Sequence, residues 1–110
     1  MSKFDEMRWQ CRIIEKQFDI IRRIGPICVS LLDEVVMYKL HITKADQRIP
    51  HGSTTAVKYR MAWARTALQE SGYVEKNSRR GEWQVTDFGA MQKNGVYGPE
   101  VIKTARALVR

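Results

Sequence analysis

The feature that most constrains the fold is residues 53–89, where a helical pattern is followed at once by an alternating one. From 54 to 71 the chain has no Gly or Pro, and apolar residues recur every three or four positions, which predicts a helix with one buried side. A hydroxyl from residues 53–55 can cap its first turn, and Gly72 stands where a left-handed residue commonly ends a helix. The buried side comprises Val57, Met61, Ala64, Leu68 and Ser71, widened by Trp63 and Ala67.

The residues that follow predict a β-hairpin. Segments 73–77 and 82–86 are rich in aromatic and β-branched residues and flank a polar loop that contains Gly81. Arg79 and Arg80 stand at the tip, and Trp83 lies on the inner side of the second segment. After the hairpin, residues 86–93 form a turn and a short helix. A basic helix followed directly by a hairpin with a basic tip is typical of a winged helix-turn-helix.

Several short motifs support this interpretation. They are Trp63-Ala64-Arg65 with Leu68, Ser71-Gly72-Tyr73-Val74, Arg80-Gly81-x-Trp83 and Thr86-x-x-Gly89. Together they resemble the winged-helix N-terminal domain of Mrr-type restriction endonucleases, over about a third of the chain. The resemblance implies this fold and a role on DNA. It does not imply cleavage, because those enzymes cut with a separate nuclease domain that these 110 residues do not resemble.

The rest of the chain adds helices at both ends. Residues 3–24 carry a wide apolar stripe and predict one long helix, which Gly25-Pro26 ends. A minor strand at 27–29, a helix at 31–40 capped by Ser30, and a polar loop at 42–52 should follow. The expected fold class is therefore α+β, mostly helical: a winged helix-turn-helix with a long N-terminal helix and an extra C-terminal helix. We expect a DNA-binding domain at 1–96 and a docking or dimerisation helix at 97–110.

The apolar sides of the first and last helices are wider than a small domain needs. They predict a homodimer through these two helices. The alternative is that the first helix is simply well buried, or packs on the C-terminal segment. Cys11 and Cys28 lie on different elements without a nearby Cys or His, so free buried thiols are expected.

The net charge of +7 is unevenly distributed. Residues 1–50 hold nine Lys/Arg against seven Asp/Glu, whereas residues 51–110 hold ten against five. A basic excess in the half with the helix and hairpin favours double-stranded DNA as the partner, because cationic side chains release counterions from phosphates. The alternative is a surface charge that only promotes solubility.

The residues expected to contact DNA lie on that helix and on the hairpin. On the helix they are Thr55, Lys58 and Tyr59 near its start, for base edges or phosphates, and Arg65 for a phosphate. On the hairpin they are Lys76, Ser78, Arg79 and Arg80, for the minor groove or its phosphates. Trp63 and Trp83 are expected in the core, and Arg60 borders the buried stripe, where it is expected to brace the preceding helix.

No catalytic or metal-binding pattern is found. The chain lacks an Asp/Glu-x-Lys triplet, a phosphate loop and a Gly-x-Ser-x-Gly elbow, and His41 and His51 have no ligand-like neighbours apart from Asp46. No cofactor, no membrane span and a cytoplasmic location are expected. The function expected is duplex DNA binding as a transcriptional regulator. The alternatives are a winged helix used for protein contact, a recognition or nuclease subunit of a restriction or phage system, and single-strand or RNA binding.

Overall fold

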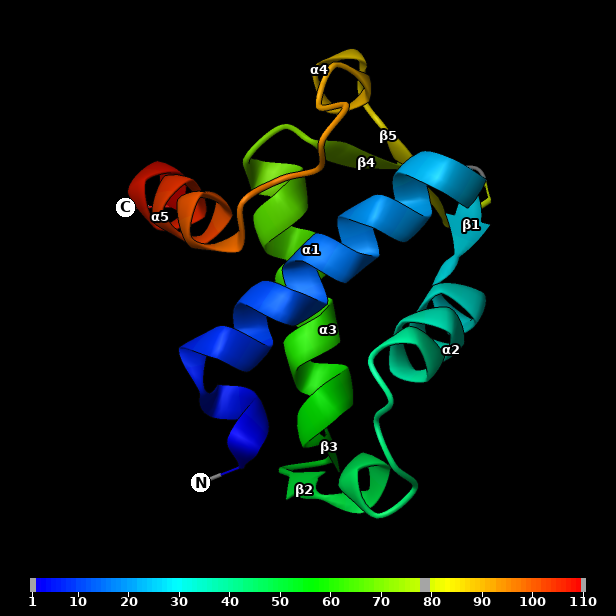
Figure 1. Ribbon diagram of the computed structural model, residues 1–110, viewed down its shortest axis with the longest axis vertical. Coiled ribbons are helices and arrows are strands. Elements are labelled where there is room, and N and C mark those ends of the chain that lie inside the picture. Colours follow the sequence, from blue (N-terminus) through cyan, green and yellow to red (C-terminus); the bar gives the residue numbers. More distant parts are fainter. Residues whose placement is uncertain (1, 78–79, 110) are drawn as a thin grey trace.

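The apolar stripe of the N-terminal segment forms α1 (Met7–Ile24), which crosses the front of the molecule in Figure 1. The computed structural model describes residues 2–77 and 80–109. Ile14, Phe18 and Ile21 on α1 are fully buried or nearly so, and they belong to the hydrophobic core of the molecule. Gln17 is also buried, and its Nε2 donates to the carbonyl oxygen of Met61 at 3.0 Å.

The prediction of one helix from residue 3 is wrong at its start. Lys3–Asp5 form a separate 3-10 turn, η1, and Glu6 has extended backbone angles (φ −68°, ψ 138°) before α1 begins. The turn is closed by a reciprocal pair of bonds, in which Ser2 Oγ accepts from Phe4 N–H and Asp5 Oδ2 accepts from Ser2 N–H. Phe4 of this turn is buried in the core, and Lys3 Nζ donates to Asp46 Oδ2 at 2.7 Å, so the turn is held against the body of the protein.

The minor strand and the second helix are present, but their junction differs from the prediction. Strand β1 (Ile27–Cys28) leads directly into α2 (Val29–Lys39), so Cys28 occupies the N-cap position and Ser30 lies inside the helix. Cys28 is consequently exposed, which corrects the expectation of a buried thiol, whereas Cys11 is buried. A hydrogen bond with the Ser30 hydroxyl lowers the pKa of the Cys28 thiol, and burial raises that of Cys11.

Residues 42–55 are more structured than the predicted loop. They contain a 3-10 turn, η2 (Asp46–Arg48), and an antiparallel pair of two-residue strands, β2 (Pro50–His51) and β3 (Thr54–Thr55). Helix α3 (Ala56–Glu70) therefore begins two residues later than predicted. Thr55 is its N-cap residue, but the Thr55 side chain makes no cap bond. Its Oγ1 is buried and has no hydrogen-bond partner.

The end of α3 is as predicted. Gly72 has φ +85°, its N–H donates to Gln69 O, and Tyr73 N–H donates to Leu68 O, which is the bonding pattern of a helix closed by a left-handed glycine. The chain then enters the hairpin of β4 (Val74–Asn77) and β5 (Glu82–Val85). We call this hairpin the wing.

Strands β1, β5 and β4 form an antiparallel sheet in that order, with Ile27 opposite Trp83 and Lys76 opposite Trp83 on the other side. Trp83 is buried as predicted, and Trp63 is half-buried against the core. A short helix, α4 (Asp87–Ala90), follows the wing and is capped by Thr86, whose Oγ1 accepts from Gly89 N–H. The arrangement is the predicted α+β, winged-helix type of fold.

The last helix, α5 (Gly98–Val109), packs on α1 and α3 of its own chain. Val101, Ile102 and Ala105 are buried there, and Glu15 Oε2 of α1 accepts from Gly98 N–H at 2.7 Å. The prediction of a homodimer depended on apolar sides of the first and last helices that have no partner within one chain. Since these sides cover one another within one chain, the structure does not support that argument.

Candidate nucleic-acid interface

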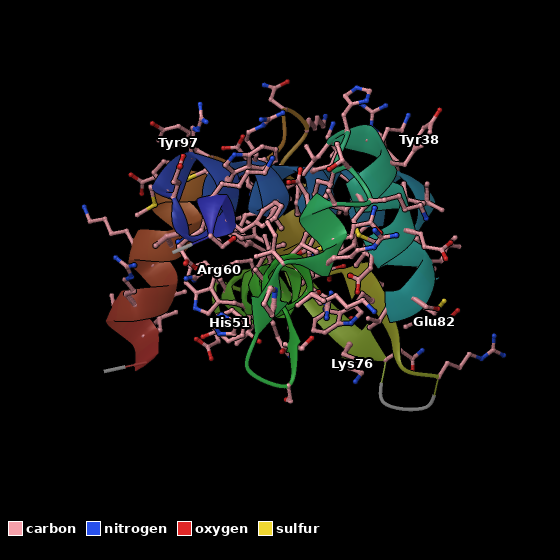
Figure 2. All side chains as sticks on the ribbon, turned by 90° about the horizontal axis from the view of Figure 1, so that it is seen from below. Tyr38, His51, Arg60, Lys76, Glu82 and Tyr97 are labelled. Atoms are coloured by element: carbon pink, nitrogen blue, oxygen red, sulfur yellow. The ribbon has the colours of Figure 1, made fainter. Side chains whose placement is uncertain are left out.

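Helix α3 turns one side to α1 and leaves the opposite side uncovered. Seen from below (Figure 2), α1 lies on one side of α3, whereas the β2–β3 hairpin and the wing project on the other, with His51 and Lys76 among them. In Figure 1 the β2–β3 hairpin adjoins the N-terminal end of α3, and the wing lies near its other end. We call the uncovered side of α3 together with these two hairpins the outer face.

The centre of the outer face is formed by exposed residues one helical turn apart on α3. Tyr59, Ala62 and Thr66 occupy this line, and Tyr59 is 40% exposed. Lys58 is also exposed, but it lies on the flank that faces α2, where its charge acts on Asp33 and where it lines a groove with Lys44. Lys58 and Tyr59 are thus both accessible, as the sequence led us to expect.

Arg65 lies on the inside, which corrects the expectation that it serves a phosphate. Only 9% of the residue is exposed, and its Nη1 donates to Asp33 Oδ1 of α2 at 2.7 Å. Burial raises the pKa of the Asp33 carboxyl, and the Arg65 guanidinium opposes this shift. The pair joins α2 to α3. Thr55 is likewise unsuited to base contact, because it belongs to β3 and its hydroxyl oxygen is buried.

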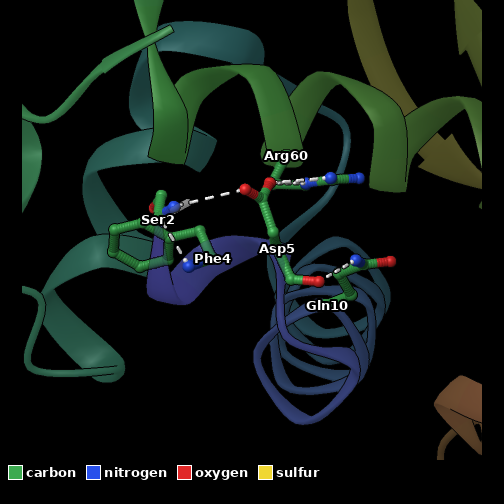
Figure 3. Close-up of polar contacts among 5 residues, drawn as sticks. All are labelled: Ser2, Phe4, Asp5, Gln10 and Arg60. Carbon is green, nitrogen blue, oxygen red and sulfur yellow. Dashed lines mark hydrogen bonds and ion pairs between the residues drawn. The ribbon is translucent and has the colours of Figure 1, made fainter.

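Arg60 is anchored at the edge of α3, although to a different element than expected. Its Nη2 and Nε both lie within hydrogen-bond distance of Asp5 Oδ1, at 2.8 and 3.2 Å, rather than near α2 (Figure 3). The bond from Arg60 lowers the pKa of the Asp5 carboxyl. The carbonyl of Asp5 accepts from Gln10 Nε2, so the η1 turn is fixed to both α1 and α3.

The wing presents Lys76 and Arg80, both exposed, on the strand and near the tip. Lys76 lies on the same side of the molecule as His51 (Figure 2). The expected contacts Ser78 and Arg79 fall outside the described residues. The wing also carries the carboxylates Glu75 and Glu82, and Glu75 Oε1 accepts from Gln84 Nε2 on the adjacent strand, which leaves its negative charge in place. Within the described part of the wing, the accessible cations are therefore Lys76 and Arg80.

Sequence reasoning missed the β2–β3 hairpin and, with it, His51. The rings of His51 and Tyr59 are stacked, with centroids 3.9 Å apart and planes inclined by 28°. The available signal was Gly52-Ser53 between a proline-histidine pair and two β-branched threonines, because a Gly-Ser pair favours a two-residue hairpin turn. Four strand residues are too few to show an alternating pattern, so the sequence alone does not predict this hairpin.

In residues 2–77 and 80–109, no group of three or more His, Cys, Asp or Glu side chains is arranged to hold a metal ion. None of the helices in this part of the chain is both long enough and apolar enough to cross a membrane.

One of three comparisons with known proteins, the comparison with family models, returned a match. A search of curated proteins and a search of solved structures each returned no match. The family model described as the Mrr N-terminal domain matches residues 27–93, from β1 to just beyond α4, and so covers more than half of the chain. The matched segment contains α2, α3 and the wing, which is the part of the fold that forms the outer face. The chain therefore belongs to the Mrr N-terminal domain family.

Proposed function

We propose that the protein binds double-stranded DNA with its outer face, α3 entering the major groove and the wing lying along an adjacent backbone. Membership in the Mrr N-terminal domain family indicates a domain related to DNA binding or to restriction systems. The single observation that carries the proposal is that Lys76 of the wing lies on the same side of the molecule as the accessible side of α3 (Figure 2), on a wing that also carries the exposed Arg80.

The dimensions of α3 are suited to this role. A 15-residue helix is about 22 Å long, and the major groove is about 12 Å wide, so a helix that lies steeply across the groove has both ends near the phosphates. Tyr59, Ala62 and Thr66 would then face the bases. Ala62 allows close approach, and Tyr59 offers a hydroxyl group to base edges. The Thr66 hydroxyl donates to Ala62 O at 3.2 Å, so it would meet a base edge as an acceptor.

Phosphate contacts would supply most of the affinity, because Lys76 and Arg80 of the wing and Lys58 on the flank of α3 are exposed and the protein carries a net charge of +7. Residues 1–96 would form the binding unit, and residues 97–110 would support it by docking on α1 and α3. The proposal needs no second copy of the chain.

The role we propose is that of a transcriptional regulator that binds without cleaving. A non-catalytic recognition part of a restriction or phage system would use the same contacts. Selection of bound fragments from genomic DNA separates the two, since a regulator should select sites that lie upstream of genes. Metal-dependent nicking of DNA by the isolated protein would contradict binding without cleavage.

The experiment that tests the proposal is the salt dependence of affinity for random duplex DNA, measured by fluorescence anisotropy. In the double variant Lys76→Ala with Arg80→Ala, two phosphate contacts are removed, so the slope of log K against log salt concentration should fall by about two. The matched control is Lys16→Ala with Lys39→Ala, which removes two charges from the groove beside α1. The control should keep the wild-type slope.

Two outcomes would overturn the proposal. If the wild-type protein fails to bind duplex DNA at low salt, the outer face serves another partner, such as an acidic protein surface. If both double variants reduce the slope equally, the binding is a property of the net charge and not of the outer face.

A further inference from the structure

The β2–β3 hairpin extends the outer face beyond the N-terminal end of α3, and the DNA contacts proposed above, on α3 and the wing, do not include it. Pro50 pairs with Thr55 and His51 with Thr54, which leaves Gly52 and Ser53 as a two-residue tip. Gly52 has φ +58°, a conformation that favours glycine at the first position of such a turn. All five residues from 50 to 54 are exposed.

The hairpin is held firmly against α3. Ala56 N–H donates to Ile49 O at 2.8 Å, which closes the base of the hairpin. The His51 ring stacks on Tyr59 in the first turn of the helix, and the adjacent Arg60 is fixed by Asp5. The hairpin is therefore preorganised and does not have to be ordered when a ligand binds.

The electrostatic character of this region suits a polyanion. Residues 47–69, which include the hairpin and nearly all of α3, contain no Asp or Glu. Arg60 and Arg65 of this segment are paired with Asp5 and Asp33, which leaves Arg48 and Lys58 as its exposed Lys and Arg side chains. Asp5 lies close enough to His51 to interact with it, but its carboxylate already accepts from Arg60. Residues 47–69 therefore present no carboxylate of their own that would repel a phosphate.

We propose that the β2–β3 hairpin is a second DNA-contacting hairpin, which binds the phosphate backbone at the N-terminal end of α3, opposite the end near the wing. This inference rests on the proposed function. Ser53 and Thr54 supply hydroxyl donors, and the space beside Gly52 is open, since a Cβ built there meets nothing within 4 Å. Hydroxyl and backbone N–H groups are common phosphate ligands in protein–DNA complexes. The stack of His51 on Tyr59 fixes the hairpin relative to the base-facing side of α3.

The test uses substitutions that leave the fold intact. Ser53→Glu places a negative charge at the exposed tip, and Thr54→Val removes one hydroxyl while it keeps the β-branched shape that suits a strand. The matched control is Asn94→Glu, which adds the same charge at an exposed position of the groove beside α1. Duplex affinity, hydroxyl-radical footprints and thermal midpoints are measured for each protein.

We expect Ser53→Glu to weaken duplex binding about tenfold and Thr54→Val to weaken it less, with thermal midpoints unchanged. The footprint of Ser53→Glu should lose protection on one flank of the site only, and Asn94→Glu should behave as the wild type. If the wild type binds duplex DNA while Ser53→Glu matches Asn94→Glu in affinity and footprint, the hairpin inference is overturned and the proposed function stands. If the wild type does not bind duplex DNA, both fail.

Discussion

The surroundings of Arg65 distinguish two roles for this residue of α3: an ion pair with α2, or a contact with a DNA phosphate. Its position borders the exposed side of α3, yet its guanidinium bonds to Asp33, and the side chains of the two residues are only 11% and 12% exposed. Removing one partner from such a pair leaves a charge without compensation in a poorly solvated site. The pair therefore fixes the position of α3 on α2.

The corresponding prediction is that Arg65→Met lowers the free energy of unfolding by about 3 kcal/mol, measured by urea denaturation. The double variant Asp33→Leu with Arg65→Met should recover most of this loss, because neither charge then remains buried. At temperatures where the single variant is folded, the salt slope of DNA binding should equal that of the wild type. A phosphate-contacting Arg65 would show the reverse: normal stability and a slope lower by about one.

Gly89 is a second residue whose identity follows from close packing. A Cβ at this position would lie 2.0 Å from the carbonyl oxygen of Tyr73 and 3.3 Å from Cβ of Val85. Thr86 holds Gly89 close to this backbone, since its Oγ1 donates to Gly72 O and accepts from Gly89 N–H. The Thr-x-x-Gly motif thus closes α4 onto the strand that follows α3.

We predict that Gly89→Ala destabilises the protein by about 1–3 kcal/mol, because the backbone of Tyr73 must move to admit a methyl group. Thermal unfolding followed by circular dichroism measures the loss. Ala90→Ser, at the next and exposed position, should change the stability by less than about 0.5 kcal/mol. A Gly89→Ala protein as stable as Ala90→Ser would contradict this packing argument.

At the scale of elements, the η1 turn connects the N-terminus to the helix of the outer face through Asp5 and Arg60. The pKa of Asp5 is lowered from 3.8 in the folded protein, so the unfolded chain binds more protons as the pH falls through this region. The stability that this carboxylate contributes is thus present above about pH 4 and is lost as the pH falls through the folded pKa. The shift for Asp33 has the opposite sign, because burial raises its pKa.

The contribution of Asp5 is therefore isolated by comparing the pH dependence of the thermal midpoint in Asp5→Asn and in the wild type. Between pH 5 and pH 2.5, approximately the range in which carboxylates titrate, the thermal midpoint of Asp5→Asn should fall less steeply than that of the wild type. Contributions from Asp33 cancel in this comparison. Parallel midpoint curves for the two proteins would show that the Asp5–Arg60 bond adds no pH-dependent stability.

The elements that the sequence predicted well are those with a long repeat. The apolar stripes of α1 and α3 and the left-handed Gly72 are local patterns, and each was found near its predicted place. The contacts of Arg60 and Arg65 were not predictable in this way, because their partners lie 55 and 32 residues away in the sequence. A helical repeat shows that a side chain borders the core, but it does not identify the element that covers it.

In the molecule as a whole, the proposed binding surface for duplex DNA is a single face, formed by the accessible side of α3 and a hairpin near each of its ends. Helices α1 and α5 lie behind or beside this face and serve as its support. This arrangement does not require the dimer expected from the sequence, since the apolar side of α5 is buried against α1 and α3 of its own chain.

The most direct test of this claim is a map of backbone amide chemical shifts while duplex DNA is titrated into the isotope-labelled protein at low salt. The account predicts that the largest changes occur in residues 51–66 and 74–82, and that α1 and α5 change little. Changes concentrated on α1 or α5, or a spectrum that DNA leaves unaltered, would contradict it.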